Sequence, residues 1–194
     1  MAGGQGLKLH KGSALDPVGV FMRTMLRFPK PLIAAVNGPA IGVGTTLLPH
    51  CDIVYASETA SFLTPFSRLA FVPEFCSSVT FPRLMGQSTA NEMLLLSKQL
   101  SVTRAKEVGF VSDIFPQKGF LDRVLQELSA GLNFPVLDRT LPLFKYMIKR
   151  FDADFLERVC VWELKRLDER ASSGESAEAI IAFMQSSKKK KSNL

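Results

Sequence analysis

The residues best able to do chemistry in this 194-residue sequence are glycines, because the groups that they offer are backbone amides. An apolar segment, Leu32 to Val36, ends at Asn37-Gly38, and the turn Gly42-Val43-Gly44 precedes a short apolar helix expected from Thr45 to Leu48. Glycines at such a junction let the backbone approach a ligand and leave N–H groups pointing outward at a helix start. Those N–H groups suit a phosphate, or an oxygen on which negative charge develops. Tight packing of strand against helix is the alternative explanation.

Glu74 is the candidate proton carrier. It is flanked by Phe71, Val72 and Phe75, and an apolar surround raises the pKa of a carboxyl group toward the range useful for acid–base chemistry. From the local sequence alone, a solvated loop carboxylate is the simpler interpretation. Cys76 lies two residues further on, but no adjacent base is evident that would make its thiol a nucleophile.

Several other kinds of site are disfavoured. His10 and His50 are the only histidines, and the three cysteines show no C-x-x-C spacing, so we expect no metal site and no Ser-His-Asp triad. The glycine turn lacks the G-x-G-x-x-G of dinucleotide sites and the G-K-[ST] of P-loops.

Composition describes an ordinary globular protein of one domain, with 46% hydrophobic and 22% charged residues. Of the net charge of +6, four charges come from Lys188 to Lys191, which leaves +2 for the rest and little case for a nucleic-acid surface. No apolar run approaches the roughly 18 residues of a membrane span.

Strands alternate with helices along the chain, which predicts an α/β fold. Apolar periodicity and breaker residues place these elements. Strands are expected at 32–36, 52–56 and 110–115, a loop at 62–73, and helices at 18–26, 77–84, 90–96, 103–108, 120–128, 155–171 and 176–185, with most of the chain helical from Val136 onward.

The sequence over roughly residues 1 to 185 resembles the crotonase (enoyl-CoA hydratase/isomerase) superfamily. The segments that carry the resemblance are Lys30-Pro-Leu-Ile-Ala-Ala-Val-Asn-Gly-Pro-Ala-Ile-Gly-Val-Gly44, Cys51-Asp-Ile-Val-Tyr-Ala56, Ala60-Ser-Phe62, Pro65, Val72-Pro-Glu-Phe-Cys-Ser-Ser78 and Ser101 to Val111. The resemblance implies a spiral of ββα units over residues 1–133, a helical region at 134–187 that builds trimers or hexamers, and a basic tail at 188–194.

The resemblance also implies the site. An enolate derived from an acyl-CoA thioester would be held by two backbone N–H groups, one from Val43 and one from Gly3 in the opening Met1-Ala-Gly-Gly-Gln-Gly-Leu7. Coenzyme A would arrive as part of the substrate, with no separate cofactor. The remaining implied contacts are CoA phosphates on Lys8 or Lys11, and an acyl pocket lined by Phe66, Phe71 and Phe75.

The general base decides which reaction follows. Hydratases of this family use two glutamates, at positions held here by Thr46 and Phe66, neither of which can carry a proton. The run around Glu74 is similar instead to the Pro-Glu-Gly-Cys-Ser-Ser context of peroxisomal Δ3,Δ2-enoyl-CoA isomerases, with Phe75 in place of glycine. There one glutamate removes a C2 proton from a 3-enoyl thioester and returns it at C4, which implies that activity here.

Other functions stay open at this point. Family members have several strands before the loop at which this chain begins, so we expect an exposed sheet edge and an incomplete pocket. That expectation favours a non-catalytic crotonase-like interaction module. Hydration, thioester hydrolysis or dienoyl isomerisation are enzymatic alternatives.

The chain ends Ser192-Asn193-Leu194, which resembles the peroxisomal address Ser-Lys-Leu. This predicts an import receptor as partner and a peroxisomal or glycosomal location. A solvated chain end is the other explanation, and a mitochondrial or cytoplasmic location the alternative.

Overall fold

In a computed structural model, residues 16–133 and 137–192 are described. Two short 3₁₀ turns accompany its helices and strands. The elements in chain order are α1 (Asp16–Leu26), β1 (Ile33–Val36), β2 (Pro39–Ile41), α2 (Val43–Thr46), η1 (Leu48–His50), β3 (Ile53–Ser57), β4 (Ser61–Leu63), η2 (Ser67–Leu69), α3 (Ser77–Leu94), β5 (Leu100–Ser101), α4 (Val102–Glu107), β6 (Asp113–Phe115), α5 (Phe120–Leu132), α6 (Leu137–Ala171) and α7 (Gly174–Ser192).

The strands form two small sheets, and the first four strands alternate between them. One sheet has the order β1-β3-β6 and is parallel throughout; the other has the order β2-β4-β5, with β2 and β4 parallel. Each of the pairs β1–β2 and β3–β4 is followed by a helix, so the chain makes successive ββα turns. The expected α/β spiral is confirmed.

The main core lies between the strands and the helices α3 and α4. Its centre is aromatic: the ring of Phe110 meets the rings of Phe62 and Phe81 edge-on, at centroid distances of 5.3 and 5.5 Å. Phe62 and Phe81 are completely buried. Edge-to-face aromatic contacts of this kind add to the stabilisation that burial of the rings already gives.

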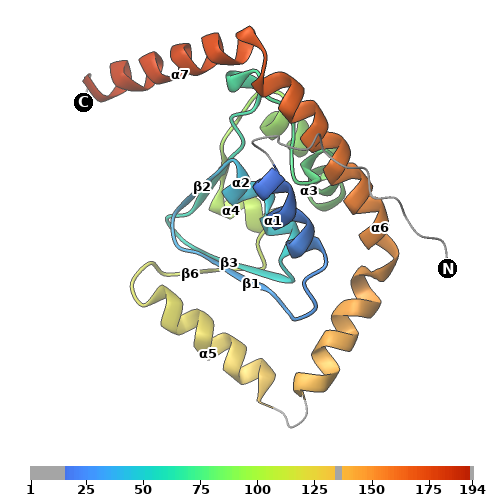
Figure 1. Cartoon of the computed structure of the whole chain (residues 1–194). Coiled ribbons are helices and arrows are strands. Elements are labelled where there is room, and N and C mark those ends of the chain that lie inside the picture. Colours follow the sequence, from blue (N-terminus) through green and yellow to red (C-terminus); the bar gives the residue numbers. More distant parts are fainter. Residues whose placement is uncertain (1–15, 134–136, 193–194) are drawn as a thin grey trace, which may run out of the picture.

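Figure 1 shows α6 running along one side of the molecule past α1 and α3, with α5 beside β6 and α7 projecting from the end of α6. A second buried cluster joins α6 to α1 and to the segment after Glu74. Its fully buried members are Met22, Phe75, Cys76, Cys160 and Leu164. The C-terminal helical region is thus packed against the residues next to the candidate proton carrier.

The sequence-based elements agree with the structure where the apolar pattern is long and differ where strands are short. Residues 62–73, expected as a loop, contain most of β4 and the turn η2. The strands β2 and β5 were not expected; they have three and two residues, too few to show a period, and β2 begins at Pro39. The two helices expected at 77–84 and 90–96 are one element, kinked at Gly86, whose φ is 77°.

Among the described helices, none combines the length and the apolar content that crossing a membrane requires.

Replacing Phe62 with alanine should lower the free energy of unfolding by about 3–5 kcal/mol, because a completely buried ring is removed from a packed core. Urea unfolding followed by circular dichroism measures the loss. Leu96→Ala is the control: that side chain is 66% exposed, and its loss should cost less than about 1 kcal/mol. Equal losses for the two variants would contradict the position of the core.

Candidate active site

The glycine turn has the backbone geometry that the sequence predicts. Gly42 adopts φ 58° and ψ −124°, a conformation that residues with a Cβ rarely reach. Its N–H donates to the Leu63 carbonyl at 2.8 Å, and its carbonyl accepts from the N–H groups of Thr45 (2.8 Å) and Thr46 (3.0 Å). Both flanks of the turn are therefore fixed.

Val43 is the first residue of α2, and the first N–H groups of a helix have no carbonyl partner within it. No group in the described part of the chain accepts a hydrogen bond from the Val43 N–H. The Val43 side chain is 45% exposed, so this amide lies near the surface. It is available to a ligand oxygen.

Glu74 is buried, with 4% of its surface exposed. One carboxyl oxygen, Oε1, accepts a short hydrogen bond from the hydroxyl of Thr46, which is completely buried in α2. The other, Oε2, is buried and has no partner among the described residues. A buried carboxyl oxygen without a partner is costly in a purely structural role and is common where a group has to exchange a proton.

Burial raises the pKa of Glu74 from 4.5 to about 7; the hydrogen bond from Thr46 lowers it, and the negative charge of Glu163 raises it. A carboxyl group with a pKa near 7 can both accept and return a proton at neutral pH. The interpretation of Glu74 as a solvated loop carboxylate is not supported, since its side chain is out of solvent.

Thr46 links the two parts of the site. It lies three residues after Val43 and touches the Glu74 carboxyl group, so α2 connects the glycine turn to the candidate proton carrier. From the sequence, Thr46 was only a residue that cannot act as a base. Its hydrogen bond to Glu74 spans 28 residues, and nothing in the local sequence indicates it.

The two residues after Glu74 both have left-handed backbone conformations, with φ 54° at Phe75 and 63° at Cys76. Such conformations cost about 1–3 kcal/mol each for residues other than glycine and persist only where the surroundings enforce them. This explains why glycine suits position 75 in the pattern that the sequence resembles. Phenylalanine at this position requires compensation elsewhere.

His50 supplies part of that compensation. Its ring stacks on the ring of Phe75 at a centroid distance of 4.4 Å, and its Nε2–H donates to the Phe75 carbonyl at 2.8 Å. Burial lowers the pKa of His50 to about 4, so the ring is neutral at pH 7. From the sequence, His50 was only the link into a strand; its contact with Phe75 was not predicted.

The other predicted site residues lie in different surroundings. Phe66 is buried in the main core, Phe71 packs against that core, and Phe75 is completely buried in the second cluster. Their role in an acyl pocket stays a prediction. Gly3, Lys8 and Lys11 lie outside the described residues.

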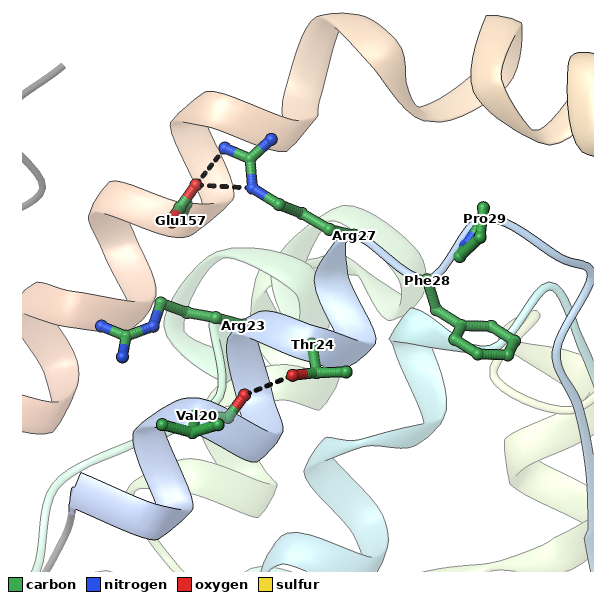
Figure 2. Close-up of a pocket in the computed structure, with 7 residues that line it drawn as sticks. All are labelled: Val20, Arg23, Thr24, Arg27, Phe28, Pro29 and Glu157. Atoms are coloured by element: carbon green, nitrogen blue, oxygen red, sulfur yellow. Dashed lines mark hydrogen bonds and ion pairs between the residues drawn. The ribbon is translucent and has the colours of Figure 1, made fainter. Parts of the chain in front are cut away.

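A cavity of about 390 Å³ lies between α1 and α6, away from Glu74 (Figure 2). It is lined by Val20, Arg23, Thr24, Arg27, Phe28, Pro29 and Glu157. The guanidinium group of Arg27 is paired with Glu157 and with Asp154, so its charge is already compensated within the protein. The carboxyl group that lines this cavity, Glu157, is held by Arg27, and Glu74 is not among the lining residues.

No group of three or more histidine, cysteine, aspartate or glutamate side chains in the described ranges could hold a metal ion.

A backbone donor beside a buried carboxyl group, on a ββα spiral, defines a class of protein suited to moving a proton next to a stabilised oxyanion. The family model for enoyl-CoA hydratase/isomerase matches residues 5–191. The chain belongs to this family, as the sequence analysis predicted.

Curated relatives of two kinds match. The chain is 39% identical to rat enoyl-CoA delta isomerase 2 over 183 residues (94% of this chain, 46% of the relative) and 37% identical to the mouse peroxisomal enoyl-CoA delta isomerase 3 over 164 residues (84% and 51%). It is 35% identical to human testis-specific chromodomain protein Y 2 over 173 residues (88% and 31%). The chain thus spans about half, or less, of the length of these relatives.

Solved structures agree on the fold. The structure of Pseudomonas aeruginosa OdaA superposes with a TM-score of 0.81 at 36% identity, over 93% of this chain and 71% of that one.

Replacing Glu74 with glutamine should make stability less dependent on pH. The folded parent holds a proton on Glu74 up to about pH 7, whereas the unfolded chain loses that proton near pH 4.5. The free energy of unfolding of the parent therefore falls as the pH rises from 4.5 to above 7. Relative to the parent, Glu74→Gln should gain about 3 kcal/mol between pH 4.5 and pH 8. Urea unfolding of both proteins across this range measures the gain; parallel curves would contradict the burial of Glu74.

Proposed function

We propose that this chain carries a Δ3,Δ2-enoyl-CoA isomerase site, in which Glu74 moves a proton from C2 to C4 of an acyl-CoA thioester. The observation that carries the proposal is the buried Glu74 carboxyl group, with a pKa near 7, joined through Thr46 to the helix whose first amide is free. Membership of the family and the likeness to two delta isomerases support it.

The chemistry needs one carboxyl group and no activated water. Glu74 as a carboxylate takes a proton from C2 of a 3-enoyl thioester, and the electron pair moves onto the thioester oxygen. The N–H groups of Val43 and Gly3 hold the resulting dienolate. Glu74 then donates the proton to C4, the oxygen regains its double bond, and the carbon–carbon double bond is left between C2 and C3.

The rest of the assignment follows the family pattern. Lys8 and Lys11 would contact the CoA phosphates, and Phe66, Phe71 and Phe75 would line the acyl channel. We divide the chain into a core at 1–133, a helical region at 134–187 and a basic tail at 188–194, although the backbone of α7 continues as a helix to Ser192.

We further propose a homotrimer or hexamer, formed through the C-terminal helical region. Large apolar side chains on the outer surface of α6 support this assembly: Tyr146, Met147, Ile148 and Phe151 are each more than half exposed. A location in peroxisomes, or in glycosomes, rests on Ser192-Asn193-Leu194 and on the mouse relative named as peroxisomal.

A second function is a non-catalytic interaction module. The match to human chromodomain protein Y 2 favours it, as do the edge strands β1 and β2, each of which pairs on one side only within the described structure. The state of Glu74 supports the isomerase over the module, because a binding module has no need of a buried carboxyl group with an unpartnered oxygen.

The deciding assay follows formation of the conjugated 2-enoyl thioester from a 3-enoyl-CoA by the purified chain. Glu74→Gln should lower kcat by about 10²- to 10⁴-fold, since the acid–base group is lost. Glu92→Gln, on the exposed surface of α3, is the matched control and should retain the parent rate. For the parent, kcat/KM should rise with pH to a plateau above the pKa of about 7, because the free enzyme needs Glu74 as a carboxylate.

A folded parent chain without turnover would overturn the isomerase assignment in favour of the binding module. Consumption of 2-enoyl-CoA by addition of water would point to hydration instead.

The oxyanion role of Val43 has its own test. Gly42→Ala should lower kcat by about 10²-fold, since alanine does not tolerate φ 58° with ψ −124° and the Val43 N–H would be turned away from the substrate. An added Cβ at Gly42 meets no atom within 4 Å, so any effect arises from conformation and not from crowding. Gly38→Ala is the control, at a glycine with equal space and without a positive φ. Equal rates for both variants would remove Val43 from the site.

A further inference from the structure

The segment from Glu74 to Ser78 is the point at which the proton carrier is attached to the fold. Ser77, the first residue of α3, donates from its N–H (3.1 Å) and its hydroxyl (2.6 Å) to the Glu74 carbonyl. Between them lie Phe75 and Cys76, both left-handed. If this turn relaxed, the Glu74 side chain would be re-aimed, because its Cα belongs to the same short segment.

The turn is held from α6 by Glu163, whose side chain is 1% exposed. Oε2 of Glu163 accepts the Cys76 N–H at 2.5 Å, and Oε1 accepts both the N–H of Ser78, at 3.1 Å, and its hydroxyl. The first N–H groups of a helix need acceptors, which a nearby side chain usually supplies. Here Cys76, the residue before α3, supplies no side-chain acceptor, and the cap comes from a residue 87 positions further along the chain.

Burying a carboxylate is costly, and Glu163 has no compensating cation: no lysine or arginine in the described ranges pairs with it. A neutral side chain would avoid that cost. The two N–H donors and the hydroxyl suit an ionised carboxylate, which accepts hydrogen bonds and donates none. Burial raises the pKa of Glu163, and the hydrogen bonds from Ser78 and Cys76 lower it, so these donors favour the ionised form. The same hydrogen bonds anchor the backbone that carries Glu74.

We propose that Glu163 is a positioning residue for Glu74: it holds the left-handed turn at Phe75 and Cys76 from the C-terminal helix and so fixes the direction of the proton-carrying group. The inference rests on the proposed isomerase function. It assigns to α6 a part in the chemistry, although Glu163 touches no substrate.

The other groups around the turn are neutral at pH 7. Burial holds the pKa of His50 near 4, and the thiol of Cys76 has a strongly raised pKa because of its contact with Cys160 and its burial. Thr46 does not titrate. Glu163 is thus the neighbouring carboxyl group, and its negative charge raises the pKa of Glu74.

The test compares the parent with Glu163→Gln and with Glu169→Gln, the same change six residues further along α6, where Glu169 forms a surface ion pair with Arg166. Glu163→Gln should lower kcat by about tenfold to hundredfold, as a displacement of about 1 Å at a reacting group does, and change KM much less. The rise of its rate with pH should move to lower pH, since both the lost charge and easier access of water lower the pKa of Glu74. Glu169→Gln should match the parent in each measurement.

A titration that does not depend on turnover separates this proposal from the isomerase function. The carboxyl carbon of Glu74, labelled with ¹³C and assigned by its absence in Glu74→Gln, should titrate at lower pH in Glu163→Gln than in the parent. If the parent shows no isomerase activity but Glu74 still titrates at lower pH in Glu163→Gln, the positioning role is supported and the isomerase function is rejected.

An unchanged Glu74 titration, or a folded Glu163→Gln protein with the parent's kcat and pH profile, would overturn the proposal. Should Glu163→Gln fail to fold, Ser78→Ala carries the same test, because it removes one of the three donors to Glu163 and keeps the carboxylate. Ser78→Ala should also lower kcat, by a smaller factor. A Ser78→Ala protein with the parent's kcat and pH profile would overturn the proposal.

Discussion

The buried contact between the Thr46 hydroxyl and the Glu74 carboxyl group is the interaction on which the site depends. It places a titratable group out of water and fixes that group against the helix that presents the Val43 amide. The proposed proton carrier and the proposed oxyanion donor would otherwise lie on separate loops. Because both are attached to α2, a shift of that short helix would move them together.

Holding Glu74 there requires a backbone that its own sequence disfavours. Phe75 and Cys76 are left-handed without being glycine, and their conformation is enforced by contacts from both sides. His50 binds the carbonyl of Phe75 from the segment after α2, and Glu163 binds the amide of Cys76 from α6. The geometry of the candidate site is thus a property of tertiary packing, since left-handed residues other than glycine persist only where their surroundings enforce them.

The sequence predicted the features that are local and missed those that are not. Residue types and periods of a few residues were enough to predict the glycine turn, the candidate role of Glu74, and the helices at 18–26, 103–108 and 120–128. The strands of two and three residues have no detectable period, so β2 and β5 could not be found this way. The contacts made by Thr46, His50 and Glu163 join residues 25 to 87 positions apart, and no pattern in a single sequence encodes such pairs.

The stacked pair of His50 and Phe75 restricts the order in which substitutions can be accepted. Glycine at position 75 would relieve the backbone but would leave a cavity where a completely buried ring now packs against the imidazole. Replacing His50 alone would leave the Phe75 carbonyl without its donor while the backbone stayed left-handed. Each single change loses what the other residue supplies, so the effects of the two are not additive. A lineage carrying this pair can exchange it only by changing both residues together or by passing through a less stable protein.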